Sequence, residues 1–244
     1  RKPLRELAPL ISNVPKARLF DEMLKLLMSG NALACVQELR QAGLHHGLLP
    51  LLDVILEQPD GERFVTAALQ RTDARIAQGK GVSPGFLFAA LLWQEVARHW
   101  QRLMAEGEHR IPALMAAIDI VLDVQAGELA IQKRHTADMR EIWSLQPRFE
   151  RRNGQAPFRL LEHLRFRAAY DFMLLRCEVG EVEAELGQWW QTFAESDAAE
   201  RHTLLMRDSA GPRAKRGPRR GRGRGRGRTG GNDHPAVPPD GQLD

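Results

Sequence analysis

Apolar residues recur at helical spacing along most of this chain, and that pattern most constrains its fold. After Pro15, apolar residues at three- and four-residue spacing predict a helix over 16–28 that stops at Ser29-Gly30. The segment 86–103 is the most strongly apolar, and Ser83-Pro84 before it is a typical helix start, with Ser as cap and Pro in the first turn. No alternating strand pattern flanked by hairpin turns occurs in the sequence, which therefore predicts an all-α fold.

Other segments extend this helical pattern. Asn31 is expected to cap a second helix that ends at Gly43, and Thr136 is expected to cap one that runs to about Gln146. Short connections favour antiparallel packing of neighbouring helices, so we expect a multi-helix array. The remaining helices are expected over 48–56, 112–122, 158–164, 167–178 and 183–193.

The end of the chain has a different character. Residues 209–231 contain nine Lys and Arg and no acid. A segment without apolar side chains cannot offset the entropy lost on ordering, so we expect residues 209–244 to be disordered. Arginine matches phosphate oxygens and stacks on bases, which makes RNA or DNA the first partner to expect, while a solubilising tail or a protein-binding tail is the alternative. The cations of this tail are Arg213, Lys215, Arg216, Arg219, Arg220, Arg222, Arg224, Arg226 and Arg228.

The rest of the chain is nearly neutral. Residues 1–208 carry 26 Lys and Arg against 28 Asp and Glu, so the basic tail reads as an arm attached to a folded body. The two cysteines, Cys35 and Cys177, suggest neither a disulfide framework nor a zinc site, and the histidines show no metal-ligand spacing. Because the sequence has no apolar run long enough to span a bilayer and no signal peptide, we expect a cytoplasmic protein. Since it begins at Arg1, we also expect it to be part of a longer one.

A second group of cations lies inside the body, between residues 130 and 170, where nine Lys and Arg face four acids. One interpretation is a track for single-stranded RNA. The alternative is ordinary helix-surface charge paired to Glu141, Glu150 and Glu162. The candidate RNA contacts in this region are Lys133, Arg134, Arg148, Arg151, Arg152, Arg159, Arg165 and Arg167.

Tryptophans and paired charges offer further candidates. The five tryptophans lie mostly on apolar helical stripes and are expected in the core, with Trp190 the best candidate for base stacking. Asp119 and Asp123 share a helix face, which we interpret as a solvated surface. Arg18 and Glu22, four residues apart, are expected to form a structural pair.

Several stretches resemble the bacterial poly(A) polymerases, members of the class II nucleotidyltransferases. Residues 17–27, Ala-Arg-Leu-Phe-Asp-Glu-Met-Leu-Lys-Leu-Leu, are similar to the neck helix of that superfamily, and residues 83–93 look like a body-domain helix. The stretches 140–149, 160–163 and 166–172 look like the family's RNA-binding region. Trp189-Trp190 followed by an arginine-rich end is similar to the family's C-terminus, and this end distinguishes it from the related CCA-adding enzymes.

The resemblance implies a domain plan and a function. Residues 1–30 would end the neck, with Arg18, Asp21 and Glu22 as its motif. Residues 31–208 would form the body, with an RNA-binding region at about 130–195, and 209–244 the tail. The implied parent enzyme adds AMP from ATP to RNA 3′ ends with Mg²⁺ and associates with DEAD-box helicases and other RNA-decay proteins. The Gly-Ser turn and paired aspartates of its catalytic head are not found in this sequence, so we expect no catalytic residue and no activity from this chain alone. The alternatives are a non-enzymatic helical RNA-binding or scaffold protein, or part of a CCA-adding enzyme.

Overall fold

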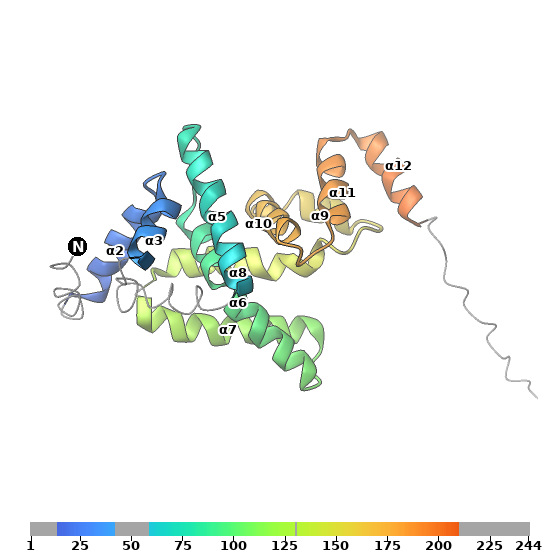
Figure 1. The fold of residues 1–244 in the computed structure, drawn as a ribbon. Helices are drawn as coiled ribbons and strands as arrows, with labels where there is room; N and C mark the ends of the chain where they lie inside the picture. Colours follow the sequence, from blue (N-terminus) through green and yellow to red (C-terminus); the bar gives the residue numbers. More distant parts are fainter. Residues whose placement is uncertain (1–13, 42–58, 130, 210–244) are drawn as a thin grey trace, which may run out of the picture. The chain divides into compact units, whose positions relative to one another are not determined.

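The computed structural model describes residues 14–41, 59–129 and 131–209, which belong to one compact unit spanning residues 1–209. Every regular element in those ranges is helical, so the predicted all-α fold is confirmed (Figure 1). The helix expected over 48–56 and the disorder expected beyond Ser209 lie outside the described residues. The elements are α2 (Lys16–Leu27), α3 (Ala32–Gln41), α5 (Pro59–Ala77), α6 (Pro84–Ala105), α7 (Arg110–Leu129), α8 (Lys133–Leu145), the 3₁₀ helix η2 (Gln146–Arg148), α9 (Ala156–Leu161), α10 (Phe166–Glu178), α11 (Ala184–Glu195) and α12 (Ala198–Ser209).

Helix α6 is the centre of the larger of two hydrophobic cores. Figure 1 shows it between α7 and α8, and it packs along both. Its buried residues include Phe88, Leu92, Trp93 and Val96, which confirms the prediction that the segment 86–103 is strongly buried. Helices α2, α3 and α5 add apolar faces to the same core.

The second core is smaller and is built from α9, α10 and α11, with Leu145 at the end of α8 and Phe149 just after η2. Phe149, Trp190 and Phe193 are completely buried in it. Helix α10 joins the two cores because its Phe172 packs in the first and its Met173 in the second. Helix α12, which the sequence reading did not anticipate, follows α11 and packs against it.

Several helix starts differ from those expected. The first free N–H groups of α3, from Ala32 and Leu33, donate to the carboxylate of Asp73 at 2.9 and 3.1 Å, so the cap comes from α5 and not from Asn31. Helix α8 starts at Lys133, three residues before the predicted cap Thr136, whose hydroxyl donates to a carbonyl within the helix. Ser83 precedes α6, with Pro in the first turn as predicted, but its side chain makes no capping hydrogen bond.

The helices of the described ranges are too short or too polar to cross a bilayer.

Candidate nucleic-acid interface

Residues 146–152, which we call the basic turn, present three arginines on a fixed backbone. Gln146 is buried, and its amide donates to the carbonyls of Ile142 and Ala169 at 3.0 and 3.1 Å. Phe149 is inserted into the second core, and its carbonyl accepts a 2.8 Å hydrogen bond from Trp190 Nε1. These bonds are made by neutral groups, and the ion pairs of the turn are made by Glu150 with Arg110 and by Arg152 with Glu185, so the anchoring uses neither Arg148 nor Arg151.

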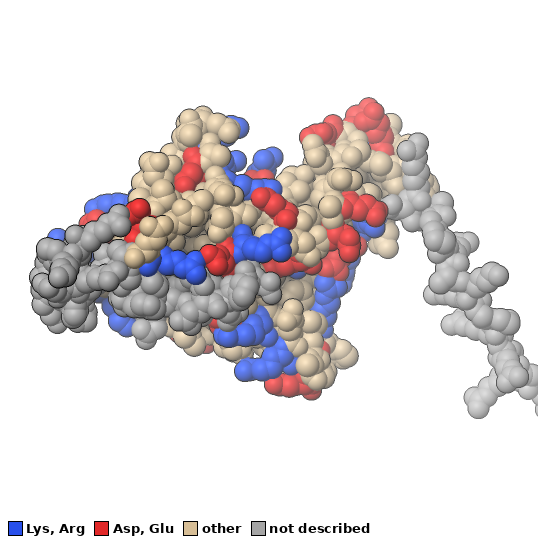
Figure 2. Space-filling model, viewed as in Figure 1, with Lys and Arg blue, Asp and Glu red and all other residues tan. Residues whose placement is uncertain are grey.

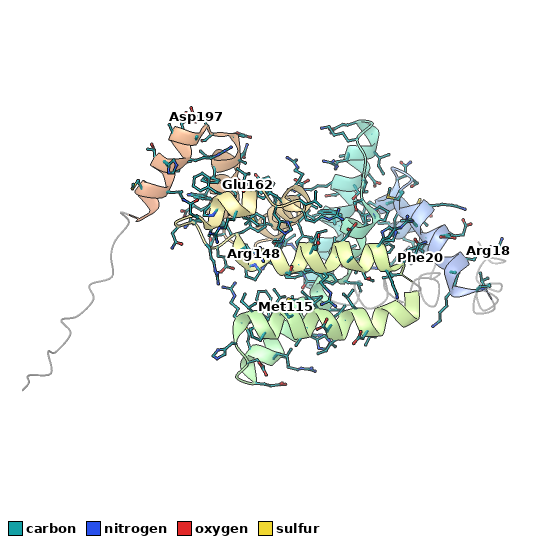
Figure 3. All side chains as sticks on the ribbon, turned by 180° about the vertical axis from the view of Figure 1, so that it is seen from behind. Arg18, Phe20, Met115, Arg148, Glu162 and Asp197 are labelled. Atoms are coloured by element: carbon teal, nitrogen blue, oxygen red, sulfur yellow. The ribbon has the colours of Figure 1, made fainter. Side chains whose placement is uncertain are left out.

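Two arginines of the basic turn are exposed and have no acidic partner in the part of the chain that the structure describes. They are Arg148 and Arg151. Figure 3 shows Arg148 at the C-terminal end of α8, far from Arg18 on α2. A cation without an acid beside it keeps its full charge for a polyanion, which suits it to a phosphate contact.

Trp189, a residue of α11, lies beside the basic turn. One face of its ring stacks on Phe193, with centroids 4.9 Å apart and planes 10° apart. The guanidinium of Arg152 lies 5.8 Å from the ring centroid and also pairs with Glu185 at 3.5 Å. Trp189 is partly exposed whereas Trp190 is completely buried, so the prediction that Trp190 was the better stacking candidate is wrong. Trp190 faces the core, where the Phe149 carbonyl satisfies its N–H.

The start of α8 is a separate basic position. Lys133 and Arg134 are exposed, and Arg134 Nε donates to Nε2 of His135 at 3.3 Å. His135 is buried against Phe20 and Phe88, and burial, assisted by the neighbouring Arg134 charge, lowers the pKa of its imidazole. A cavity of about 530 Å³ lies here, and its lining includes Arg134, His135, Asp138 and Arg165.

The other predicted contacts divide into paired and unpaired side chains. Arg165 pairs with Asp138 at 2.5 Å and with Glu141 at 3.0 Å, and Arg167 pairs with Asp171 at 3.1 Å. Arg159 on α9 is exposed and has no ion pair within the described ranges. The predicted contacts therefore do not form one track: Arg148, Arg151 and Arg152 belong to the basic turn, where Arg152 lies over Trp189, and Lys133 and Arg134 lie at the other end of α8, roughly 18 Å away.

The acids proposed as alternative partners behave differently from one another. Glu141 does neutralise Arg165, but Glu150 pairs with Arg110, a residue that the sequence reading did not consider. Figure 2 shows this wider pattern, with acidic and basic side chains interspersed over the described surface of one face. Ion pairs within the body thus neutralise part of its cations, among them Arg110, Arg140 and Arg165.

The predicted neck motif lies on an exposed face of α2. Arg18, Asp21 and Glu22 are all exposed, while Phe20 and Met23 point into the first core. Glu22 pairs with Lys25 at 2.9 Å, and this hydrogen bond holds the pKa of the Glu22 carboxyl below its ordinary value. Lys25 rather than Arg18 thus forms the ion pair with Glu22, while the Arg18 charge adds a smaller contribution to the lowered pKa of the Glu22 carboxyl.

A groove of about 960 Å³ between α6 and the α10–α11 connection was not foreseen from the sequence. It contains the carboxylate of Glu181, which accepts hydrogen bonds from Trp93 Nε1 at 2.7 Å and from Arg176 Nε at 3.2 Å. Its other cations are Arg63, Arg98 and Arg110, of which Arg98 and Arg110 are paired with Glu95 and Glu150. Because these arginines share the lining with Glu150, Glu181 and Glu183, the groove is close to neutral and attracts a polyanion only weakly.

Acidic residues show no metal-binding arrangement in the described ranges. Asp119 is exposed and pairs with Arg140 at 2.5 Å, and Asp123 is exposed as well, which agrees with the solvated helix surface that we predicted.

Comparison with known proteins identifies the family. Residues 106–226 match a family model described as "Polymerase A arginine-rich C-terminus", and residues 1–56 match one described as "Probable RNA and SrmB- binding site of polymerase A". The chain belongs to the poly(A) polymerase family. Poly(A) polymerase I of Haemophilus influenzae is 40% identical over 209 residues, which are 84% of this chain and 46% of that protein. Poly(A) polymerase I of Salmonella typhi is 39% identical over 88% of this chain and 48% of its own length. Poly(A) polymerase I of Escherichia coli O157:H7 is 38% identical over 90% of this chain and 48% of its own length.

The chain therefore spans about half the length of the curated poly(A) polymerases it matches. The arginine-rich model includes the basic turn, Trp189 and all but the last cation of the tail. The model whose description mentions RNA covers α2 and α3, a different part of the chain from the predicted region at about 130–195.

Proposed function

We propose that this chain is the RNA-binding, non-catalytic portion of a bacterial poly(A) polymerase, an enzyme that adds AMP from ATP to RNA 3′ ends. The observation that carries this proposal is the basic turn, where Arg148 and Arg151 are exposed on an anchored backbone and have no ion pair in the described ranges. It lies in the segment that matches the arginine-rich poly(A) polymerase model. The nine tail cations add the long-range attraction for RNA that a body of net negative charge lacks.

The proposal assigns RNA binding to this chain and catalysis to another part of the enzyme. ATP and Mg²⁺ would be bound by a catalytic head that this chain does not supply, so the chain alone should not extend RNA. Residues 1–30 would end the neck and residues 31–208 would form the body. A DEAD-box helicase or another RNA-decay protein would be a partner in the cytoplasm.

Salt dependence of RNA binding tests the proposal. If about five tail arginines contact phosphates of single-stranded RNA, the slope of log affinity against log salt should be roughly −3.5. Deleting residues 211–231 should flatten that slope. The variant Arg148→Gln with Arg151→Gln should flatten it by a further ~1.4, because each phosphate contact contributes about 0.7.

A matched control removes the same number of positive charges at two arginines outside the basic turn. Arg98 and Arg102 on α6 are exposed and already paired with Glu95 and Glu106. Their double substitution to Gln should leave the slope nearly unchanged. Equal effects of the two double variants would show that the basic turn has no special part in binding. An unchanged affinity after tail deletion would contradict the role of the tail.

A further inference from the structure

Trp189 is the one tryptophan of the five that is partly exposed. Trp93, Trp100, Trp143 and Trp190 are all buried. The Trp189 ring is supported on one face by Phe193, and its Nε1 is buried without a hydrogen-bond partner in the described structure. A rigidly supported indole beside a group of arginines is the arrangement that single-stranded nucleic-acid sites use for stacking.

We propose that Trp189 stacks against one base of single-stranded RNA, and that the base enters in place of the Arg152 guanidinium. The proposal rests on RNA being the ligand, as argued above, and adds the residue that contacts a base. Arg152 then moves from the ring to a phosphate next to the stacked nucleotide. The stack carries no sequence information, since every base has a π-face.

The contacts of Arg152 allow this exchange. Its guanidinium lies 5.8 Å from the Trp189 centroid, close to the outer limit of about 6 Å for a cation–π contact. Its ion pair with Glu185 is 3.5 Å long, and the Glu185 side chain is 82% exposed. An ion pair so accessible to water contributes little, so opening it costs little.

The basic turn brings phosphate contacts to the same place. The 2.8 Å hydrogen bond from Trp190 to Phe149 fixes the turn against α11, one residue from Trp189. Arg148 precedes Phe149, and Arg151 follows it after Glu150, which is bound to Arg110; both arginines are exposed without ion pairs in the described ranges. One short stretch of RNA could therefore place a base on the ring and neighbouring phosphates on the turn.

Tryptophan fluorescence tests the proposal on the unmodified 244-residue chain. Because the other four tryptophans are buried, a base that stacks should quench Trp189 alone. We expect a short oligoadenylate to quench the emission, and polyphosphate, which has the charge but no bases, to bind without quenching it.

Variants separate stacking from charge. Trp189→Leu should abolish the quenching and lower oligoadenylate affinity by about 5- to 150-fold, which corresponds to the loss of one stacked base. The slope of log affinity against log salt should stay unchanged, because no phosphate contact is removed. Trp100→Phe, which alters a tryptophan in the first core, is the matched control and should keep the quenching. Circular dichroism checks that each variant is folded. If the Trp189→Leu variant is unfolded, the fluorescence titration of the unmodified chain with oligoadenylate and polyphosphate still decides the proposal.

The outcomes distinguish this proposal from the one on which it rests. Absence of any RNA binding by the unmodified chain would overturn both. Salt-dependent binding without quenching, or equal quenching by polyphosphate, would overturn the stacking proposal alone. Unchanged affinity of a folded Trp189→Leu chain would do the same.

Discussion

The carboxylate of Glu181 should contribute more to stability than any of the exposed acids, and its removal is the most informative stability test. Glu181 accepts hydrogen bonds from Trp93 Nε1 at 2.7 Å, Gln94 Nε2 at 2.5 Å and Arg176 Nε at 3.2 Å. The Arg176 side chain is only 11% exposed, and its guanidinium lies over the Trp93 ring at 4.7 Å. Burial lowers the pKa of Arg176, and the Glu181 charge opposes that effect.

Glu181→Ala leaves two buried donors without their acceptor. An unsatisfied buried N–H such as that of Trp93 costs about 1–3 kcal/mol. Breaking a buried ion pair by removing one partner costs about 3–5 kcal/mol. This second cost is reduced here because the Glu181 side chain is itself 27% exposed and water can reach the vacated place. We therefore expect a loss of roughly 3 kcal/mol in the free energy of unfolding.

Urea denaturation followed by far-UV circular dichroism measures this loss, with Glu106→Ala as the matched control. Glu106 also pairs with an arginine of α6, Arg102, at 3.6 Å, but both side chains are more than half exposed. The control should lose no more than about 0.5 kcal/mol. Glu181→Gln should fall between the two, because its amide oxygen can still accept from Trp93 while the charge opposite Arg176 is gone. Equal losses for Glu181→Ala and Glu106→Ala would refute the argument that burial gives this network its strength.

Two further variants test the packing around Gly85 and the titration of the buried His135. Gly85→Ala should destabilise the protein by about 1–3 kcal/mol in urea denaturation, because the added Cβ would lie 2.6 Å from Asp138 Cβ. This loss is expected although alanine favours helices. Gly81→Ala is the control and should not destabilise the protein, because nothing lies within 4 Å of a Cβ at that position. Burial lowers the pKa of His135 in the folded chain below the unfolded value near 6.5, so the unfolded chain binds the proton more readily. Stability should be complete above about pH 6.5 and fall as the pH drops toward the folded pKa. His135→Gln should lose less stability than the parent chain between pH 7 and pH 5, and an unchanged pH dependence would contradict this account.

The sequence predicts helices well wherever one face is apolar and the boundaries have local signals. Helix α2 follows its prediction closely because Phe20, Met23 and Leu27 form a narrow buried stripe and Ser29-Gly30 ends it. The cap of α3 could not be predicted because Asp73, which supplies it, is 41 residues away in sequence. Helix α12 was missed because its apolar residues are few, although its start carries a local signal. Asp197 accepts hydrogen bonds from the N–H groups of Ala199 and Glu200, and the Glu200 carboxylate accepts one from the Asp197 N–H, which is a capping box.

The site was harder to predict because the sequence shows which charges exist but not which are neutralised. Arg165 and Arg148 look alike in the sequence, yet Arg165 is paired with two acids and Arg148 with none in the described structure. The tryptophan pair illustrates the same limit. Adjacent tryptophans cannot both face one core, and only tertiary contacts decide that Trp190 turns inward and leaves Trp189 at the surface.

The arrangement of neutral and charged contacts explains how an almost neutral body can still present cations to RNA. Where an arginine stabilises the fold, as Arg176 does, an acid neutralises its charge, here Glu181. In the basic turn, the uncharged Gln146 amide and Trp190 N–H hold the backbone, and the ion pairs of the turn involve only Glu150 and Arg152. Arg148 and Arg151 are therefore held beside these anchors without being neutralised. Exchanging a neutral anchor for an ion pair would keep the turn folded but remove part of its attraction for phosphate, so the position of Gln146 and Trp190 matters to binding although neither need contact RNA.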